Sequence, residues 1–284
     1  MHIDVKFEDY ISGNAIKELA DAEFLDSGAV RLQKFHQNKT PVFYCHTHRF
    51  QAALPRIADF NSKIVLLTHN GDAKITTSPN AEDADVRLMP ENVVKWFGCN
   101  ILDHNDRTVS IPTGLENTHH FPELNKARKI FDINSQVKQH RNLCYMNFNP
   151  NTNPSERGWL YHNLVFHDWV TTRYGRNGND FESYLNDIYN HTFVLCPEGN
   201  SNGHPRAGGG VGSHRVWECL YANTIPILTK GIQSEPFYDL PILFINDWNE
   251  ISEDFLRCKY DEFKSKTFNI DQLKLSYWKD QISK

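Results

Sequence analysis

Short apolar runs recur along the chain, and each is followed by polar or glycine-bearing residues. This pattern predicts buried strands that end in loops. The runs lie at 40–48, 62–72, 108–117, 142–150, 192–200, 224–231 and 241–247. Between them, apolar positions with helical spacing occur at 90–101, 155–167, 181–190, 213–223 and 253–266. Strands that alternate with helices predict parallel sheets joined by right-handed crossovers, and therefore an α/β fold.

The polar and charged stretch 121–142 is the weakest part of the chain for regular structure. It predicts a domain boundary near residue 135. A chain of 284 residues is long enough for two domains of ordinary size. We therefore expect one Rossmann-like domain over 1–135, a second over 136–268, and an amphipathic terminal helix over 269–284.

Composition narrows the class of protein. The chain is 39% hydrophobic and 23% charged, which is typical of a globular protein, and its net charge of -5 argues against a broad nucleic-acid surface. No apolar run approaches the roughly 18 residues of a membrane span, and the N-terminal segment lacks an apolar signal core. Six cysteines occur without a CxxC pair, which favours reduced thiols. These features predict a cytoplasmic protein with neither a nucleic-acid partner nor a membrane span.

A glycine-rich loop precedes the expected helix at 213–223. Gly208, Gly209, Gly210 and Gly212 permit close approach of the backbone to a ligand, and Ser213 is a candidate N-cap. The N-terminus of such a helix suits a phosphate group, and an arginine in its first turn adds a forked cation. Neither GxGxxG nor GxxxxGK[ST] is present. A surface loop without a ligand, followed by an ordinary i,i+3 charge pair, remains the alternative.

The sequence FVLCPEGN…GSHRVWECLYANTIPIL, within 190–230, resembles the nucleotide-sugar-binding segment of the exostosin-like glycosyltransferases. In that family F-x-L-x-P-x-G, a variable loop, R-x-(W/F)-E and I-P-(I/V) follow one another, and fucosyltransferase-like families share a looser version. Fainter landmarks extend the resemblance over most of 62–230. The long glycine-heavy loop and the short chain depart from the family and leave the donor's identity open.

The resemblance implies a GT-B architecture of two Rossmann-like domains, whose parallel sheets face each other across a cleft. The second domain would hold the nucleotide-sugar donor, UDP- or GDP-linked, and the first would serve the glycan acceptor. The terminal helix would cross back onto the first domain. No further cofactor is implied. The implied donor-binding residues are Arg157, Glu198, Gly199, Asn200, Ser213, His214, Arg215 and Glu218.

An inverting transferase needs a group that takes the proton from the acceptor hydroxyl. THNGD and GLEN each follow a predicted strand, and they supply Glu116 and Asp72 as candidate bases, with His69 behind them. Asn70, His46 and His48 are candidate acceptor-binding residues at the ends of two predicted strands. For each carboxylate singly, a role in capping or in a turn competes with catalysis.

Two further motifs bear on metal chemistry. Asp83-Ala-Asp85 has the DxD spacing of metal-dependent transferases, but no apolar run precedes it, so we expect a solvated acidic loop and no essential metal. The pair His46 and His48 follows a strand, as in the metal sites of amidohydrolase barrels. The alternatives to a metal-independent glycosyltransferase are therefore a metal-dependent hydrolase using that pair and a non-catalytic nucleotide-sugar-binding module.

Overall fold

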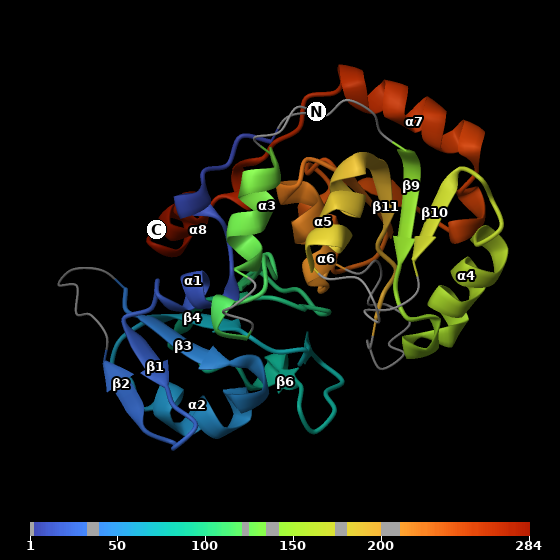
Figure 1. Ribbon diagram of the computed structural model, residues 1–284. Helices are drawn as coiled ribbons and strands as arrows, with labels where there is room; N and C mark the ends of the chain where they lie inside the picture. The colour runs from blue at the N-terminus through green and yellow to red at the C-terminus, as the bar shows by residue number, and fades with distance from the viewer. Residues whose placement is uncertain (1–2, 33–39, 121–124, 135–141, 174–180, 200–210) are drawn as a thin grey trace. The chain divides into compact units, whose positions relative to one another are not determined.

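The structure is a computed structural model, and it describes residues 3–32, 40–120, 125–134, 142–173, 181–199 and 211–284 (Figure 1). The chain divides into two compact units. Unit 1 comprises Met1–Glu8 and Gly114–Asp271, and unit 2 comprises Asp9–Thr113 and Gln272–Lys284. The predicted boundary near residue 135 falls at the edge of 135–141, outside the described residues. The division by contacts lies between Thr113 and Gly114.

Unit 2 is built on a sheet with the strand order β2-β1-β3-β4-β7-β8. All neighbouring strands in it run parallel, except for β1 and β2, which are antiparallel. A separate parallel pair is formed by β5 and β6. The strands are β1 (Ala22–Phe24), β2 (Val30–Leu32), β3 (Val42–His46), β4 (Ile64–His69), β5 (Ile75–Thr76), β6 (Ala84–Asp85), β7 (Val93–Gly98) and β8 (Thr108–Ser110).

Helices supply core residues on both faces of the unit 2 sheet. On one face, α2 (Phe50–Ala58) packs through Phe50, which stacks on Trp96 of β7 at a ring distance of 4.4 Å. The core cluster of the other face includes residues of α1 (Gly13–Lys17) and of α8 (Leu275–Ile282). From α8 come Trp278 and Ile282, so the last helix of the chain belongs to the core of unit 2.

Unit 1 contains a fully parallel sheet with the order β10-β9-β11-β12-β13. The strands are β9 (Asn142–Asn147), β10 (Val170–Arg173), β11 (His191–Leu195), β12 (Ile225–Thr229) and β13 (Leu243–Ile245). The helices are α3 (Lys126–Asn134), α4 (Trp159–Leu164), α5 (Phe181–Asn190), α6 (His214–Tyr221) and α7 (Glu253–Ser265). The core cluster that contains residues of α4 and α7 lies on one face of this sheet, and α5 and α6 pack on the other.

The mixed α/β, Rossmann-like character expected from the sequence is confirmed, and so are the strands predicted within the apolar runs. Two local predictions are wrong. The segment 90–101 contains β7 instead of a helix, because its valines and aromatic residues suit a strand that is buried in the sheet. The segment 121–142 contains α3, whose buried residues Ala127, Ile130 and Ile133 have helical spacing among surface charges.

Two other features bear on the function classes considered. The sheets of the described residues are open and have six, five and two strands, so the closed barrel of the amidohydrolase alternative is not observed among them. Among the residues described, no helix has the length and apolar character that crossing a membrane requires. All six cysteines are free thiols, and Cys258 alone is exposed.

Candidate anion site in unit 1

The sheet of unit 1 reverses its strand order next to β9. The chain passes from β9 through α4 to β10 on one side, and then through α5 to β11 on the opposite side of β9. In open parallel sheets, ligands bind beyond the carboxyl ends of the strands at such a switch point. The described parallel strands of unit 2 follow one another in sequence order and offer no equivalent reversal. The carboxyl ends of β9 and β11 therefore mark the first place to look for a ligand.

Arg157 lies at this switch point and is only 9% exposed. It belongs to a π-helical turn (Pro154–Gly158) between β9 and α4, a distortion that is frequent at functional sites. Its Nε donates to the Glu198 carbonyl at 2.8 Å, and its Nη2 donates to the Pro197 carbonyl at 3.2 Å. Its Nη1 donates to Thr152 Oγ1 at 2.7 Å. These bonds fix the guanidinium beside the loop that follows β11, and each Nη group keeps a second N–H.

Arg215 lies in the first turn of α6, as predicted. Ser213 is the N-cap of this helix and accepts from the Arg215 backbone N–H at 3.3 Å, which confirms the predicted cap. The Nε of the Arg215 side chain is buried and has no hydrogen-bond partner among the described residues. Burial disfavours its charge, but Tyr184, Cys196 and Glu218 outweigh burial and raise its pKa. A buried donor without an acceptor is costly, and a bound anion would supply the acceptor.

The two arginines act on one another electrostatically. Burial, and then the charge of Arg215, lower the pKa of Arg157 to about 10. Neither guanidinium forms an ion pair with a described carboxylate, although several ion pairs occur elsewhere in the molecule. Two guanidinium groups that make no direct ion pair with a described carboxylate, beside a helix N-terminus, form a site suited to a phosphate or diphosphate. Glu218 acts on Arg215 electrostatically, but no direct Arg215–Glu218 ion pair is present in the described part of the chain.

Two carboxylates near the arginines are engaged within the protein. Glu218 is 7% exposed, and its Oε2 accepts from the Tyr184 hydroxyl at 2.7 Å. Glu156 Oε1 accepts from Trp248 Nε1 at 2.7 Å. Burial raises the pKa of Glu156, and these hydrogen bonds only partly offset that effect. Both carboxylates are thus fixed in place by hydrogen bonds near Arg157 and Arg215.

The remaining predicted donor residues are placed around this site. Glu198 contributes its backbone carbonyl, which also accepts from Asn153 Nδ2 at 3.3 Å. A Cβ atom on Gly199 would lie 2.9 Å from Arg157 Nη2, so glycine leaves room for the guanidinium. His214 Nδ1 is 2.8 Å from the Gly114 carbonyl oxygen. Asn200 lies outside the described residues.

The candidate bases fall into different units. Glu116 lies in unit 1 with the donor residues and forms an ion pair with Lys126. Asp72 lies in unit 2 and is exposed. His69 is 2% exposed, and both of its ring nitrogens are engaged, one with the Asn70 backbone N–H at 2.7 Å and one with the Pro112 carbonyl at 3.0 Å. A histidine held in this way has no free nitrogen for an acceptor proton.

The candidate acceptor residues cluster at the ends of β3 and β4 in unit 2. His46 Nδ1 is 3.1 Å from the Asn70 carbonyl oxygen, and the rings of His46 and His48 are 5.6 Å apart. Asn70 Nδ2 donates to the Tyr44 hydroxyl at 3.0 Å. Burial, and then the charges of His46 and Arg49, lower the pKa of His48. The His48 imidazole is therefore harder to protonate than a free one.

The expectation of a solvated acidic loop at Asp83 and Asp85 is wrong. Both residues are 7% exposed. The Asp83 carboxylate accepts from the backbone N–H groups of Lys74 and Asn80, at 2.8 and 3.1 Å. Asp85 caps the turn that follows it and pairs with Arg87. These carboxylates are buried because backbone donors satisfy them, a role that the DxD spacing alone does not reveal.

Three site residues escaped the sequence-based predictions, namely Tyr184, Tyr145 and Asn147. Asn147 is the last residue of β9 and is 8% exposed. A polar residue at the end of a predicted buried strand was the available signal for it. No comparable pattern marks Tyr184, because its partner Glu218 lies on another helix.

Within the described ranges, no three His, Cys, Asp or Glu side chains gather in a way that suits a metal ion. Comparison of the sequence with models of known protein families finds no match, and comparison with curated proteins finds none either.

Proposed function

We propose that the chain is a glycosyltransferase of the GT-B class that moves a sugar from a UDP- or GDP-linked donor to a hydroxyl of a glycan acceptor. The observation that carries the proposal is the pair Arg157 and Arg215, two cations at the switch point of unit 1 that make no ion pair with a described carboxylate. The resemblance to exostosin-like enzymes supports the same assignment, since the segment 190–230 implies Arg215 and the fainter landmarks before it imply Arg157.

In this proposal, the arginines hold the diphosphate of the donor. As the glycosidic bond breaks, the leaving diphosphate gains negative charge, and two fixed cations stabilise that charge more than they stabilise the ground state. A divalent metal is not needed for this role. The N-terminus of α6, capped by Ser213, adds backbone dipoles directed at the same oxygens. Glu218 accepts a hydrogen bond from a hydroxyl of the donor.

Transfer with inversion requires a base. The base removes the acceptor proton, the acceptor oxygen attacks the anomeric carbon, and the bond to the diphosphate oxygen breaks with its electron pair. Glu116 and Asp72 remain the candidates. His69 is not included, because both of its nitrogens are engaged. The free state of the cysteines fits a reducing, cytoplasmic setting for this reaction.

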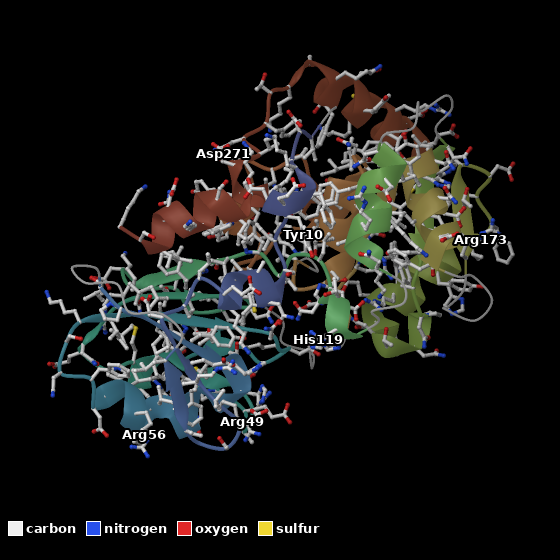
Figure 2. The ribbon with its side chains drawn as sticks, turned by 60° about the vertical axis from the view of Figure 1, so that its left-hand side comes forward. Tyr10, Arg49, Arg56, His119, Arg173 and Asp271 are labelled. Carbon is white, nitrogen blue, oxygen red and sulfur yellow. The ribbon has the colours of Figure 1, made fainter. Side chains whose placement is uncertain are left out.

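Thermal unfolding in the presence of UDP-, GDP- and CMP-sugars tests the donor assignment. A ligand at 100 times its Kd stabilises the folded state by about 2.7 kcal/mol. We expect a shift with one or more nucleotide diphosphate sugars and its loss in Arg215→Ala. Arg215→Lys should restore only part of it, because lysine keeps the charge without the fork. The matched control is Arg56→Ala, which removes an exposed arginine of α2 in unit 2 (Figure 2).

Transfer itself needs a separate assay. If the chain is an enzyme, Glu116→Gln or Asp72→Asn should abolish transfer and leave the donor-induced thermal shift unchanged. Donor binding without transfer by the unaltered protein, over a broad set of glycan acceptors, would favour the binding module. Absence of any shift with all three donor classes would refute the proposal.

A further inference from the structure

Four polar side chains of unit 1 form a continuous hydrogen-bonded chain that ends at the switch point. Arg173 Nε contacts Asp187 Oδ2 at 3.3 Å, and the same oxygen accepts from the Tyr145 hydroxyl at 3.1 Å. Tyr145 Oη in turn accepts from Asn147 Nδ2 at 2.8 Å. Arg173 lies at the surface, on β10 (Figure 2), whereas Tyr145 is fully buried.

The chemistry of these four side chains fixes which group donates and which accepts in each of their hydrogen bonds. Asp187 is paired with the Arg173 cation, and an ionised carboxylate accepts hydrogen bonds but cannot donate them. The Tyr145 hydroxyl must therefore donate its single proton to Asp187, and its oxygen is left as an acceptor. Only the NH2 end of the Asn147 amide can donate to that oxygen. The carbonyl oxygen of the amide, Oδ1, is consequently turned away from Tyr145. The hydrogen bonds themselves thus settle which end of the amide is oxygen and which is nitrogen.

Asn147 lies at the same end of the sheet as the residues that hold Arg157. The pairing of Val194 with Tyr145, continued by two residues, places Asn147 level with Cys196, the residue that precedes Pro197. The next residue, Phe148, has its ring 5.6 Å from the Arg157 guanidinium. Burial raises the pKa of Tyr145, the hydrogen-bond partner of Asn147, and the charge of Arg215 partly opposes that effect.

We propose that Asn147 is a binding residue that determines specificity: its Oδ1 accepts a hydrogen bond from an O–H or N–H group of the ligand whose phosphates Arg157 and Arg215 hold. Tyr145 is the positioning residue that keeps this acceptor in place. The inference rests on the proposed function and sharpens it, because it requires a hydroxyl or amide donor beside the diphosphate. A bare pyrophosphate satisfies the arginines but lacks the sugar hydroxyls and base N–H groups of a nucleotide sugar.

Calorimetric titration with three probes separates the two requirements: inorganic pyrophosphate, UDP-glucose and GDP-mannose. Asn147→Ala should weaken the tighter nucleotide sugar by about fivefold to tenfold, the worth of one hydrogen bond, and leave pyrophosphate nearly unchanged. Tyr145→Phe, which preserves shape, should act in the same direction by a smaller factor. Asn147→Asp keeps acceptor oxygens but loses the N–H that donates to Tyr145, so it should weaken both ligands through its charge and also reduce the preference for the nucleotide sugar.

Asn163→Ala, at an exposed position of α4, is the matched control and should change nothing. The inference is overturned if Asn147→Ala weakens pyrophosphate and nucleotide sugar by the same factor, or weakens neither. If Asn147→Ala fails to fold, Tyr145→Phe provides the test instead. The comparison is again between the loss of affinity for the nucleotide sugar and the loss of affinity for pyrophosphate. If the unaltered protein binds pyrophosphate but neither nucleotide sugar binds more tightly, the proposed function itself fails.

Discussion

The Arg157 guanidinium occupies the space where a side chain on Gly199 would lie: a Cβ atom on Gly199 would come within 2.9 Å of Arg157 Nη2. The guanidinium cannot easily move aside, because Thr152, Pro197 and Glu198 hold it by hydrogen bonds. The absence of a side chain at Gly199 is thus part of the geometry of the anion site, and it links the loop after β11 to the turn before α4.

Gly199→Ala should therefore displace the Arg157 guanidinium and weaken pyrophosphate binding several-fold, with a small effect on folding. Gly158→Ala is the matched control, since its Cβ would make only ordinary contacts, the shortest at 3.7 Å. Calorimetric Kd values for pyrophosphate measure the difference. Equal affinities in the two variants would contradict the role given to Arg157.

Substitutions of Ser213 separate helix capping from anion binding. Ser213→Ala removes the N-cap of α6 and should cost about 1 kcal/mol, a fall in Tm of a few degrees for a protein of this size. Ser213→Asp keeps a good cap, so stability should be retained, but its negative charge should oppose phosphate at the same helix end. Thermal unfolding with and without pyrophosphate measures both effects. An aspartate variant that binds pyrophosphate as well as serine does would argue against the site.

His191 should make unit 1 sensitive to acid. It is 1% exposed, stacks on Tyr145, and its Nε2 has no partner among the described residues. Burial lowers its pKa below the ordinary 6.5. The unfolded chain therefore binds the proton more readily than the folded one, and stability falls as pH decreases below about 6.5. His191→Phe keeps the stack and removes the titration.

We expect the free energy of unfolding of His191→Phe to fall less between pH 7 and pH 5 than that of the unaltered protein. The exposed His167 provides the control: the free energy of unfolding of His167→Gln should change with pH as it does in the unaltered protein. Parallel pH profiles for all three proteins would exclude His191 as the source of acid lability.

Gly13 should be intolerant of substitution. A Cβ there would lie 1.7 Å from Asn70 Oδ1 and 2.8 Å from His69 Nδ1, and neither side chain is free to retreat. Overpacking of this kind costs roughly 1–3 kcal/mol. Gly71→Ala, two residues from His69 in the same loop, meets its nearest side-chain atom at 3.6 Å and should be nearly neutral. Chemical denaturation of both variants tests this contrast.

The fold was accessible from the sequence where burial and pattern agree. β4 and β11 are fully buried, and their unbroken apolar runs identify them. β7 was mistaken for a helix because Lys95 interrupts its apolar residues and imitates helical spacing. α3 was missed because its charged residues outnumber the apolar face that packs against α5 and α6. The pattern of apolar and polar residues within one segment does not show which side of that segment a neighbouring helix or strand will cover.

The candidate site divides in a similar way. Arg157, Ser213 and Arg215 were predicted because strand ends and helix starts are visible in a sequence. The hydrogen-bonded series from Asp187 to Asn147 was not predicted, because its central bond joins helix α5 to strand β9 between Asp187 and Tyr145, which are 42 positions apart in the sequence. The engaged state of His69 was equally hidden, since Pro112 is 43 residues away.

The placement of α8 has a consequence for biosynthesis. Trp278 and Ile282 complete one core of unit 2, yet they are translated only after the whole of unit 1. A ribosome-bound nascent chain carrying residues 9–113 therefore exposes an unfilled apolar face while the intervening 158 residues, Gly114–Asp271, are made. The core of unit 2 can close only after α8 has emerged, by which time all of unit 1 has been made.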